Sequence, residues 1–207
     1  IGGWVTSNIP AHQVLVRTVD GTYIAGIVGS KPPHYITESE RNQAPAIENL
    51  YIDIGASSRK EVHDLGIRAG NPIVPKAELE FKDDEIIFGK AFDDRLGCVA
   101  IVEILESLRG KSLPVNPVGI FSSQEEVGLR GAQVAANTLK PDAAICFEGT
   151  PADDTFESAD RQQTVLGKGP MLRYIDSKMI TNPRFQRFAL DVAKKYDIPV
   201  QTAVRTG

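Results

Sequence analysis

The sequence predicts an α/β fold in which a small β-barrel-like domain accompanies a mixed-sheet domain. Residues 12–88 contain several short runs of β-branched and aromatic residues separated by turns, which is typical of a small barrel or sandwich. From residue 89 onward, helical patterns alternate with short apolar runs, which indicates helices on the faces of a sheet. We therefore place the domains at residues 1–88 and 89–207.

The clearest element of the first domain is a hairpin. Residues 12–19 and 22–28 flank Asp20-Gly21, a pair that favours a tight turn between strands. The polar segment 30–45 is predicted to be a loop, and residues 59–65 a short helix. Further short strands are expected at 50–54, 71–74, 78–81 and 85–88.

The second domain begins with a helix that we expect to be buried. Residues 94–108 carry apolar side chains at helical spacing, and Gly110 follows as a stop signal. Asn182-Pro183 opens another helix, because Pro suits the first turn. The remaining elements are a helix at 129–139 and strands at 118–121, 143–147 and 200–204.

Composition excludes several classes of protein. A net charge of -4 and a pI near 5.5 argue against binding nucleic acid through phosphate contacts, which requires a basic surface. No apolar run approaches the roughly 20 residues that span a bilayer, and the N-terminus has no signal-peptide pattern. Cys98 and Cys146 lie in apolar stretches, where thiols are usually buried, and form no metal-binding pair. A reducing cytoplasm is the simplest compartment.

Acidic residues gather at the ends of the predicted elements. Asp93-Asp94 precedes the first helix, Glu125-Glu126 follows the strand at 118–121, and Glu148 follows the strand at 143–147. Ligands of open α/β sheets bind outside the carboxyl ends of strands. Converging carboxylates repel one another unless a cation lies among them, and divalent cations with oxygen ligands are the natural choice.

A structural interpretation remains open beside this one. Any single acidic pair also fits a solvated surface or a helix start. Asp83-Asp84-Glu85 reads as a turn and Asp153-Asp154 as a loop. The three histidines adjoin none of the acidic clusters, so they are not expected to be ligands; they are His12, His34 and His63.

Two motifs make the sequence recognisable. GKAFDDRLG at 89–97 and SQEEVGLRGA at 123–132 resemble the glutamyl and tetrahedral (TET-type) aminopeptidases, a family of co-catalytic metallopeptidases. Further segments that match the family are IGGW at 1–4, GSKPPH at 29–34, DIGASS at 53–58, LGKGP at 166–170 and DSKM at 176–179. The resemblance covers almost the whole chain.

The resemblance implies a metallopeptidase catalytic domain interrupted by a small β-barrel-like insert used in subunit contacts. Asp93 would bridge two divalent ions, usually zinc or cobalt, while Glu126 would bind one ion and Glu148 the other. Glu125 would be the general base that activates water. Asp94 would orient its surroundings, and the Asp93–Asp94 peptide bond is expected to be cis. The implied substrates are peptides with a free N-terminus, and the implied assembly is a homo-oligomer of dimers that build a dodecamer.

The sequence departs from the family pattern in two respects. Many relatives have Asp at the position of Glu148, although the longer carboxylate can still bind a metal. The family also supplies a His ligand on each side of residues 1–207, so this chain alone could be inactive. We expect it to belong to a longer enzyme. Alternatives are a glycoside hydrolase, which also uses paired carboxylates, and a catalytically incomplete assembly module.

Overall fold

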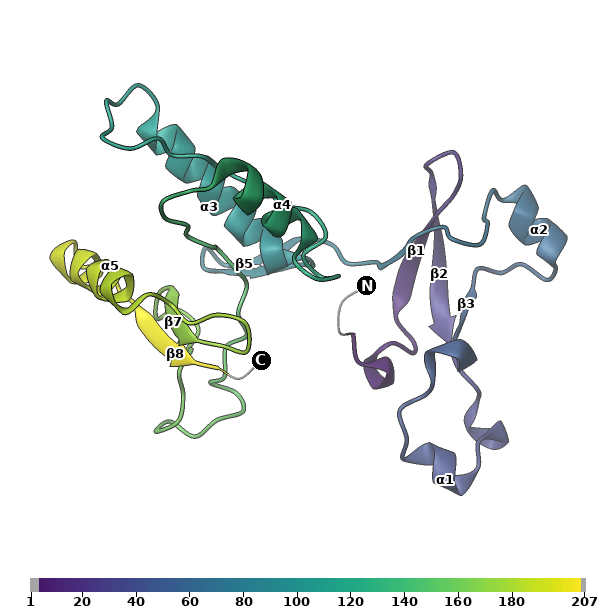
Figure 1. Ribbon diagram of the computed structural model, residues 1–207. Coiled ribbons are helices and arrows are strands. Elements are labelled where there is room, and N and C mark those ends of the chain that lie inside the picture. Colours follow the sequence, from purple (N-terminus) through teal and green to yellow (C-terminus); the bar gives the residue numbers. More distant parts are fainter. Residues whose placement is uncertain (1–3, 206–207) are drawn as a thin grey trace. The chain divides into compact units, whose positions relative to one another are not determined.

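The computed structural model describes residues 4–205, so the first three residues of the IGGW motif lie outside the described part. The chain separates into two compact units, residues 1–146 and 147–207. The first contains the β-rich segment and two long helices, and the second a parallel strand pair with one helix (Figure 1). Within the described residues, no helix is both long and apolar enough to cross a membrane.

A β-hairpin, predicted from the sequence, forms the centre of the largest sheet in the first unit. Strand β1 (Gln13–Arg17) pairs antiparallel with β2 (Tyr23–Gly29). The turn is held by the Asp20 carboxylate, whose Oδ1 accepts hydrogen bonds from the backbone N–H of Thr22 at 3.1 Å and from the Thr22 hydroxyl at 2.9 Å. An Asp side chain that binds the backbone two residues on stabilises a turn locally.

Two shorter strands extend the hairpin into an open sheet. Strand β3 (Tyr51–Asp53) pairs with β2, and β4 (Ile73–Pro75) pairs with β1, both antiparallel, giving the order β3-β2-β1-β4. Alternate residues of the central strands are buried and form a small core of Val14, Val16 and Val28. In the described residues β3 and β4 are edge strands, so no closed barrel forms and the barrel-like part of the prediction is not confirmed.

Short helices occupy the connections of this sheet. The predicted loop at 30–45 contains α1 (Glu38–Arg41), which begins with a capping box between Thr37 and Glu40. The predicted short helix is α2 (Arg59–Asp64), capped by the Ser58 side chain. Single 3₁₀ turns lie at Thr6–Asn8, Pro33–Tyr35 and Ile47–Asn49.

A second hairpin and two helices complete the first unit. Strands β5 (Glu80–Lys82) and β6 (Ile86–Phe88) pair antiparallel across the acidic turn predicted at 83–85. Helix α3 (Phe92–Leu108) follows, and α4 (Arg130–Leu139) comes later in the chain.

The prediction that the first long helix is buried is wrong for the described chain. Only Gly97 is buried in α3, whereas Leu96 is 59% and Val99 57% exposed. Helical spacing shows where the apolar face lies but not whether another element covers it. Cys98 and Cys146, predicted to be buried, are also exposed.

Two predicted strands are absent from the described chain. Residues 118–121 and 143–147 are extended coil, without a strand ladder. Apolar runs become strands only when a neighbouring strand accepts their backbone hydrogen bonds, and they find none among the described residues. The first run packs on α3 instead, where Gly119 lies against the side chains of Leu105 and Ile101.

The second unit is a βαβ arrangement. Strand β7 (Met171–Ile175), which the sequence analysis did not predict, pairs in parallel with β8 (Gln201–Val204), and α5 (Pro183–Lys195) connects them. Helix α5 begins where predicted, because the Asn182 side chain accepts hydrogen bonds from the first turn. Parallel strands require such a crossover connection.

Candidate metal centre

The first candidate residues, Asp93 and Asp94, open helix α3. Both have non-helical backbone angles, and the peptide bond between them is cis, as the resemblance implies. Asp94 is half-buried, and its Oδ1 accepts a hydrogen bond from the backbone N–H of Gly97 at 2.9 Å. The Asp94 carboxylate therefore caps the regular part of the helix, where negative charge is favoured.

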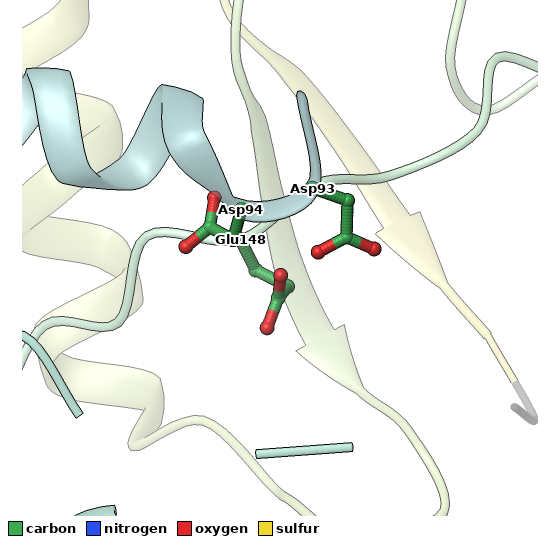
Figure 2. A group of neighbouring side chains, drawn as sticks. All are labelled: Asp93, Asp94 and Glu148. Atoms are coloured by element: carbon green, nitrogen blue, oxygen red, sulfur yellow. The ribbon is translucent and has the colours of Figure 1, made fainter. Parts of the chain in front are cut away.

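The glycine at position 97 is required by this cap. A Cβ atom there would overlap the carboxylate of Asp94, and Gly97 is the buried residue of the helix. Asp93, in contrast, is exposed, and within residues 4–205 its side chain forms no hydrogen bond or ion pair. The pair thus has one carboxylate engaged with the helix and one available to a ligand (Figure 2).

The second candidate pair, Glu125 and Glu126, lies on the loop that leads into α4. Both side chains are exposed. The carbonyl oxygen of Glu125 accepts hydrogen bonds from the N–H groups of Gly128, at 3.0 Å, and Leu129, at 2.9 Å. The loop closes where the N–H of Gly131 donates to the carbonyl of Ser123 at 2.9 Å.

Close backbone contact explains the glycine at the end of this loop. A Cβ atom at position 131 would overlap the backbone of Ser123, so a larger residue would force the ends of the loop apart. The two glutamates are therefore carried by a short loop with a closed base. The sequence predicts these carboxylates after a strand, but the residues before them are coil.

The last candidate, Glu148, stands at the beginning of the second unit, on coil that follows the apolar run 143–147. It is exposed, and its Oε1 accepts a hydrogen bond from the N–H of Gly149 at 2.9 Å. Figure 2 labels its side chain and those of Asp93 and Asp94, which belong to the first unit; all three are carboxylates, the oxygen donors that divalent ions bind.

The three histidines lie in the β-rich part of the first unit. His12 precedes β1, and its ring contacts that of Trp4 edge to face, with centroids 5.3 Å apart. His34 is in a 3₁₀ turn and His63 is in α2. None of them belongs to a group of potential metal ligands in the part of the chain that the structure describes.

A buried carboxylate that sequence patterns do not single out lies downstream of Glu148. Asp153 is in coil, as predicted, but it is buried and forms an ion pair with Arg205, Oδ2 to Nη2 at 3.0 Å. Burial raises the pKa of Asp153. Hydrogen bonds from the N–H groups of Thr164 and Gln163 and the charge of Arg205 lower the pKa by more than burial raises it, so it lies below its ordinary value. No local signal identifies this pair, because its partners are 52 positions apart.

A second ion pair of the same unit was also missed. Nη1 of Arg173, on β7, lies 3.2 Å from Oδ2 of Asp176, and both side chains are mostly buried. The N–H of Lys178 is the main cause that lowers the pKa of Asp176; burial opposes it, and Arg173 and Met179 add to the lowering. The other amine of the guanidinium, Nη2, donates to Oγ1 of Thr150 at 3.3 Å.

Comparison with known proteins assigns the chain to a family. The M42 glutamyl aminopeptidase family model matches residues 1–207. The chain belongs to the M42 glutamyl aminopeptidase family. The glutamyl aminopeptidase of Lactococcus lactis is 33% identical over an alignment of 209 positions that covers 100% of this chain and 58% of that protein.

Solved structures of TET peptidases have the same fold. A TET aminopeptidase from a marine sediment archaeon of the Thaumarchaeota is 36% identical, with a TM-score of 0.92, over 100% of this chain and 59% of that one. The TET1 peptidase of Pyrococcus horikoshii, described as assembling into a tetrahedron or a large octahedral shell, is 29% identical, with a TM-score of 0.83, over 100% of this chain and 61% of that one. The chain thus spans about three fifths of these M42 relatives.

Proposed function

We propose that the protein containing this M42 chain is a metal-dependent aminopeptidase that removes N-terminal residues from peptides. The family match over residues 1–207 carries this proposal. The second support is chemical: Asp93, Asp94 and Glu148 carry carboxylates, and divalent ions prefer oxygen donors of this kind. Zinc also binds Asp and Glu oxygens, but it usually has His or Cys ligands beside them, which further residues would have to supply.

Each acidic residue has a separate role in this proposal. Asp93 would be a ligand of both divalent ions, Glu126 would hold one of them and Glu148 the other, and Asp94 would orient the first turn of α3. Zinc or cobalt ions, when bound, polarise the scissile carbonyl and make a water molecule more acidic. Glu125 accepts the proton of that water and delivers it to the leaving amine, as a general base and then a general acid.

The location and assembly of the protein belong to the same proposal. We place the enzyme in the cytoplasm, acting on peptides and not on nucleic acid or membranes. The β-rich residues 1–88 form the insert used in subunit contacts, residues 89–207 form part of the catalytic domain, and dimers build a dodecamer. The solved relative described as a tetrahedral or octahedral shell supports a multi-subunit assembly.

Substitution of the proposed base tests the function. The whole protein is assayed for release of p-nitroaniline from aminoacyl p-nitroanilides, and its metal content is measured by inductively coupled plasma mass spectrometry. We expect Glu125→Gln to abolish turnover and to leave two ions per subunit. Turnover at the wild-type rate in this variant would refute the role of Glu125.

Chelation separates the alternatives. An aminopeptidase loses activity in EDTA and recovers it with zinc or cobalt. A glycoside hydrolase of the paired-carboxylate type would cleave a β-glucan in the presence of EDTA. An assembly module would bind fewer than two ions and hydrolyse neither substrate, but would still form the oligomer in analytical ultracentrifugation.

A further inference from the structure

The segment that begins with Glu148 has little regular structure of its own to hold it. Residues 148–153 are coil, so no strand ladder fixes their backbone. A Glu side chain also has one more rotatable bond than Asp, and ordering it costs more conformational entropy. The Glu148 carboxylate accepts a hydrogen bond from the N–H of Gly149, so contacts that hold the backbone of the residues that follow also affect its position.

Arg173 makes such a contact. Its Nη2 donates to Oγ1 of Thr150, two residues after Glu148, at 3.3 Å, while its Nη1 is paired with Asp176 at 3.2 Å. The guanidinium group therefore bridges β7 and the coil with the two arms of one rigid planar fork, a geometry that lysine does not reproduce.

The position of the guanidinium is itself fixed. Oδ1 of Asp176 accepts hydrogen bonds from the N–H groups of Lys178, at 2.7 Å, and Met179, at 2.8 Å. The Asp176 side chain is only 16% exposed, and that of Arg173 only 23%. Because the carboxylate is held by two backbone donors, the arginine that it binds has little freedom to leave Thr150.

A second contact holds the far side of the same segment. The hydroxyl of Thr164 donates to the carbonyl oxygen of Pro151 at 3.2 Å. Asp153 accepts hydrogen bonds from the N–H groups of Gln163 and Thr164 and is paired with Arg205. The coil after Glu148 is thus fastened immediately beyond the proposed ligand, at Thr150, and again further along.

We infer that Arg173, acting through the Thr150 hydroxyl, is a positioning residue that holds Glu148 in place as a metal ligand. The inference rests on the proposed function, because it concerns the ion assigned to Glu148. Neither Arg173 nor Thr150 touches that ion in this arrangement. Loss of a group that hydrogen-bonds a metal ligand directly typically weakens metal affinity by about 10- to 100-fold, and because Thr150 and Arg173 act on Glu148 through the backbone, we expect the lower end of that range.

Metal binding of the whole protein tests the inference without relying on turnover. Each purified variant is titrated with Co²⁺, and the dissociation constant of each ion and the visible absorption of the bound cobalt are recorded. We expect Thr150→Val to raise the dissociation constant of one ion about tenfold or more and to change its absorption spectrum. Thr150→Ser, which keeps the hydroxyl, should restore both.

Two further variants identify the interaction. Arg173→Lys should weaken the same ion, and the double variant Thr150→Val/Arg173→Lys should be no weaker than the single ones, because both lose one shared hydrogen bond. Thr138→Val is the control, because the Thr138 hydroxyl donates to the carbonyl oxygen of Val134 within helix α4. The cobalt affinity of this variant should equal that of the wild type.

The outcomes separate this inference from the proposed function. Wild-type cobalt affinity in Thr150→Val, together with loss of one ion in Glu148→Gln, overturns the positioning role and leaves the aminopeptidase proposal intact. Two tightly bound ions in Glu148→Gln contradict the ligand assignment itself. Equal losses in Thr150→Val and Thr150→Ser would mean that the hydroxyl is irrelevant, and would also overturn the inference.

Discussion

Oδ2 of Asp153 lies 3.0 Å from Nη2 of Arg205, although the two residues are 52 positions apart in the sequence. Removing one member of a buried pair leaves the other charge without compensation, which destabilises a protein more than losing a surface pair does. We expect Asp153→Ala to lower the midpoint of thermal unfolding by roughly 5 °C or more, measured by differential scanning fluorimetry.

An exposed pair gives the matched control for that experiment. Lys60 and Asp64 form an ion pair at 2.6 Å on α2, with side chains that are 84% and 61% exposed. Surface pairs of this kind contribute little to stability. The variant Asp64→Ala should unfold within about 2 °C of the wild type, and an equal loss in both variants would show that burial of Asp153 is unimportant.

The same pair predicts a pH dependence. The pKa of Asp153 in the folded protein lies below its ordinary value of 3.8, so its contribution to stability is fully present above that value and is lost as the pH falls through the folded pKa. The difference in unfolding midpoint between wild type and Asp153→Asn should therefore be constant from about pH 7 to about pH 5 and shrink toward about pH 2. A difference that grew on acidification would contradict the sign of the shift.

The start of α3 predicts a steric effect. Because a Cβ atom at position 97 would overlap the Asp94 carboxylate, Gly97→Ala should lower the free energy of unfolding by about 1–3 kcal/mol, measured by urea denaturation. The variant Asp94→Ala removes the carboxylate that the added Cβ atom would overlap. The double variant Asp94→Ala/Gly97→Ala should therefore be as stable as Asp94→Ala alone; a further loss would place the clash elsewhere.

The cap of α5 predicts a smaller loss. Oδ1 of Asn182 accepts hydrogen bonds from the N–H groups of Arg184 at 3.0 Å and Phe185 at 3.4 Å. Asn182→Ala should lower the free energy of unfolding by about 1 kcal/mol, whereas Asn182→Asp, which keeps the acceptor, should change it by only a few tenths. If Asn182→Ala were as stable as the wild type in urea denaturation, these hydrogen bonds would not contribute to stability.

Features fixed by neighbouring residues could be predicted from the sequence. The hairpin at Asp20-Gly21 is confirmed, because turn chemistry and β-branched runs act within a few positions. The helix that begins after Asn182 is confirmed for the same reason, since its cap and first-turn proline are local. Asp93 and Asp94, at the start of α3, could be identified because they lie in a contiguous sequence motif, residues 89–97.

Features that depend on distant partners could not be predicted. The runs at 118–121 and 143–147 have strand-like composition, yet a strand requires a neighbour, and none pairs with them among the described residues. The burial and ion pair of Asp153 could not be predicted from the neighbouring sequence, because its partner Arg205 is far along the chain. The roles of Glu125, Glu126 and Glu148 stay predictions that the metal-binding and turnover experiments decide.

The loop between Ser123 and Gly131 has one more consequence. Its two ends are joined by a backbone hydrogen bond of 2.9 Å, and the glycine lies directly on the opposite backbone. A loop whose ends already meet can be exchanged for another of similar base without moving the elements on either side. Residues 124–130, which carry both glutamates, should therefore be exchangeable as one unit, provided that Gly131 is kept.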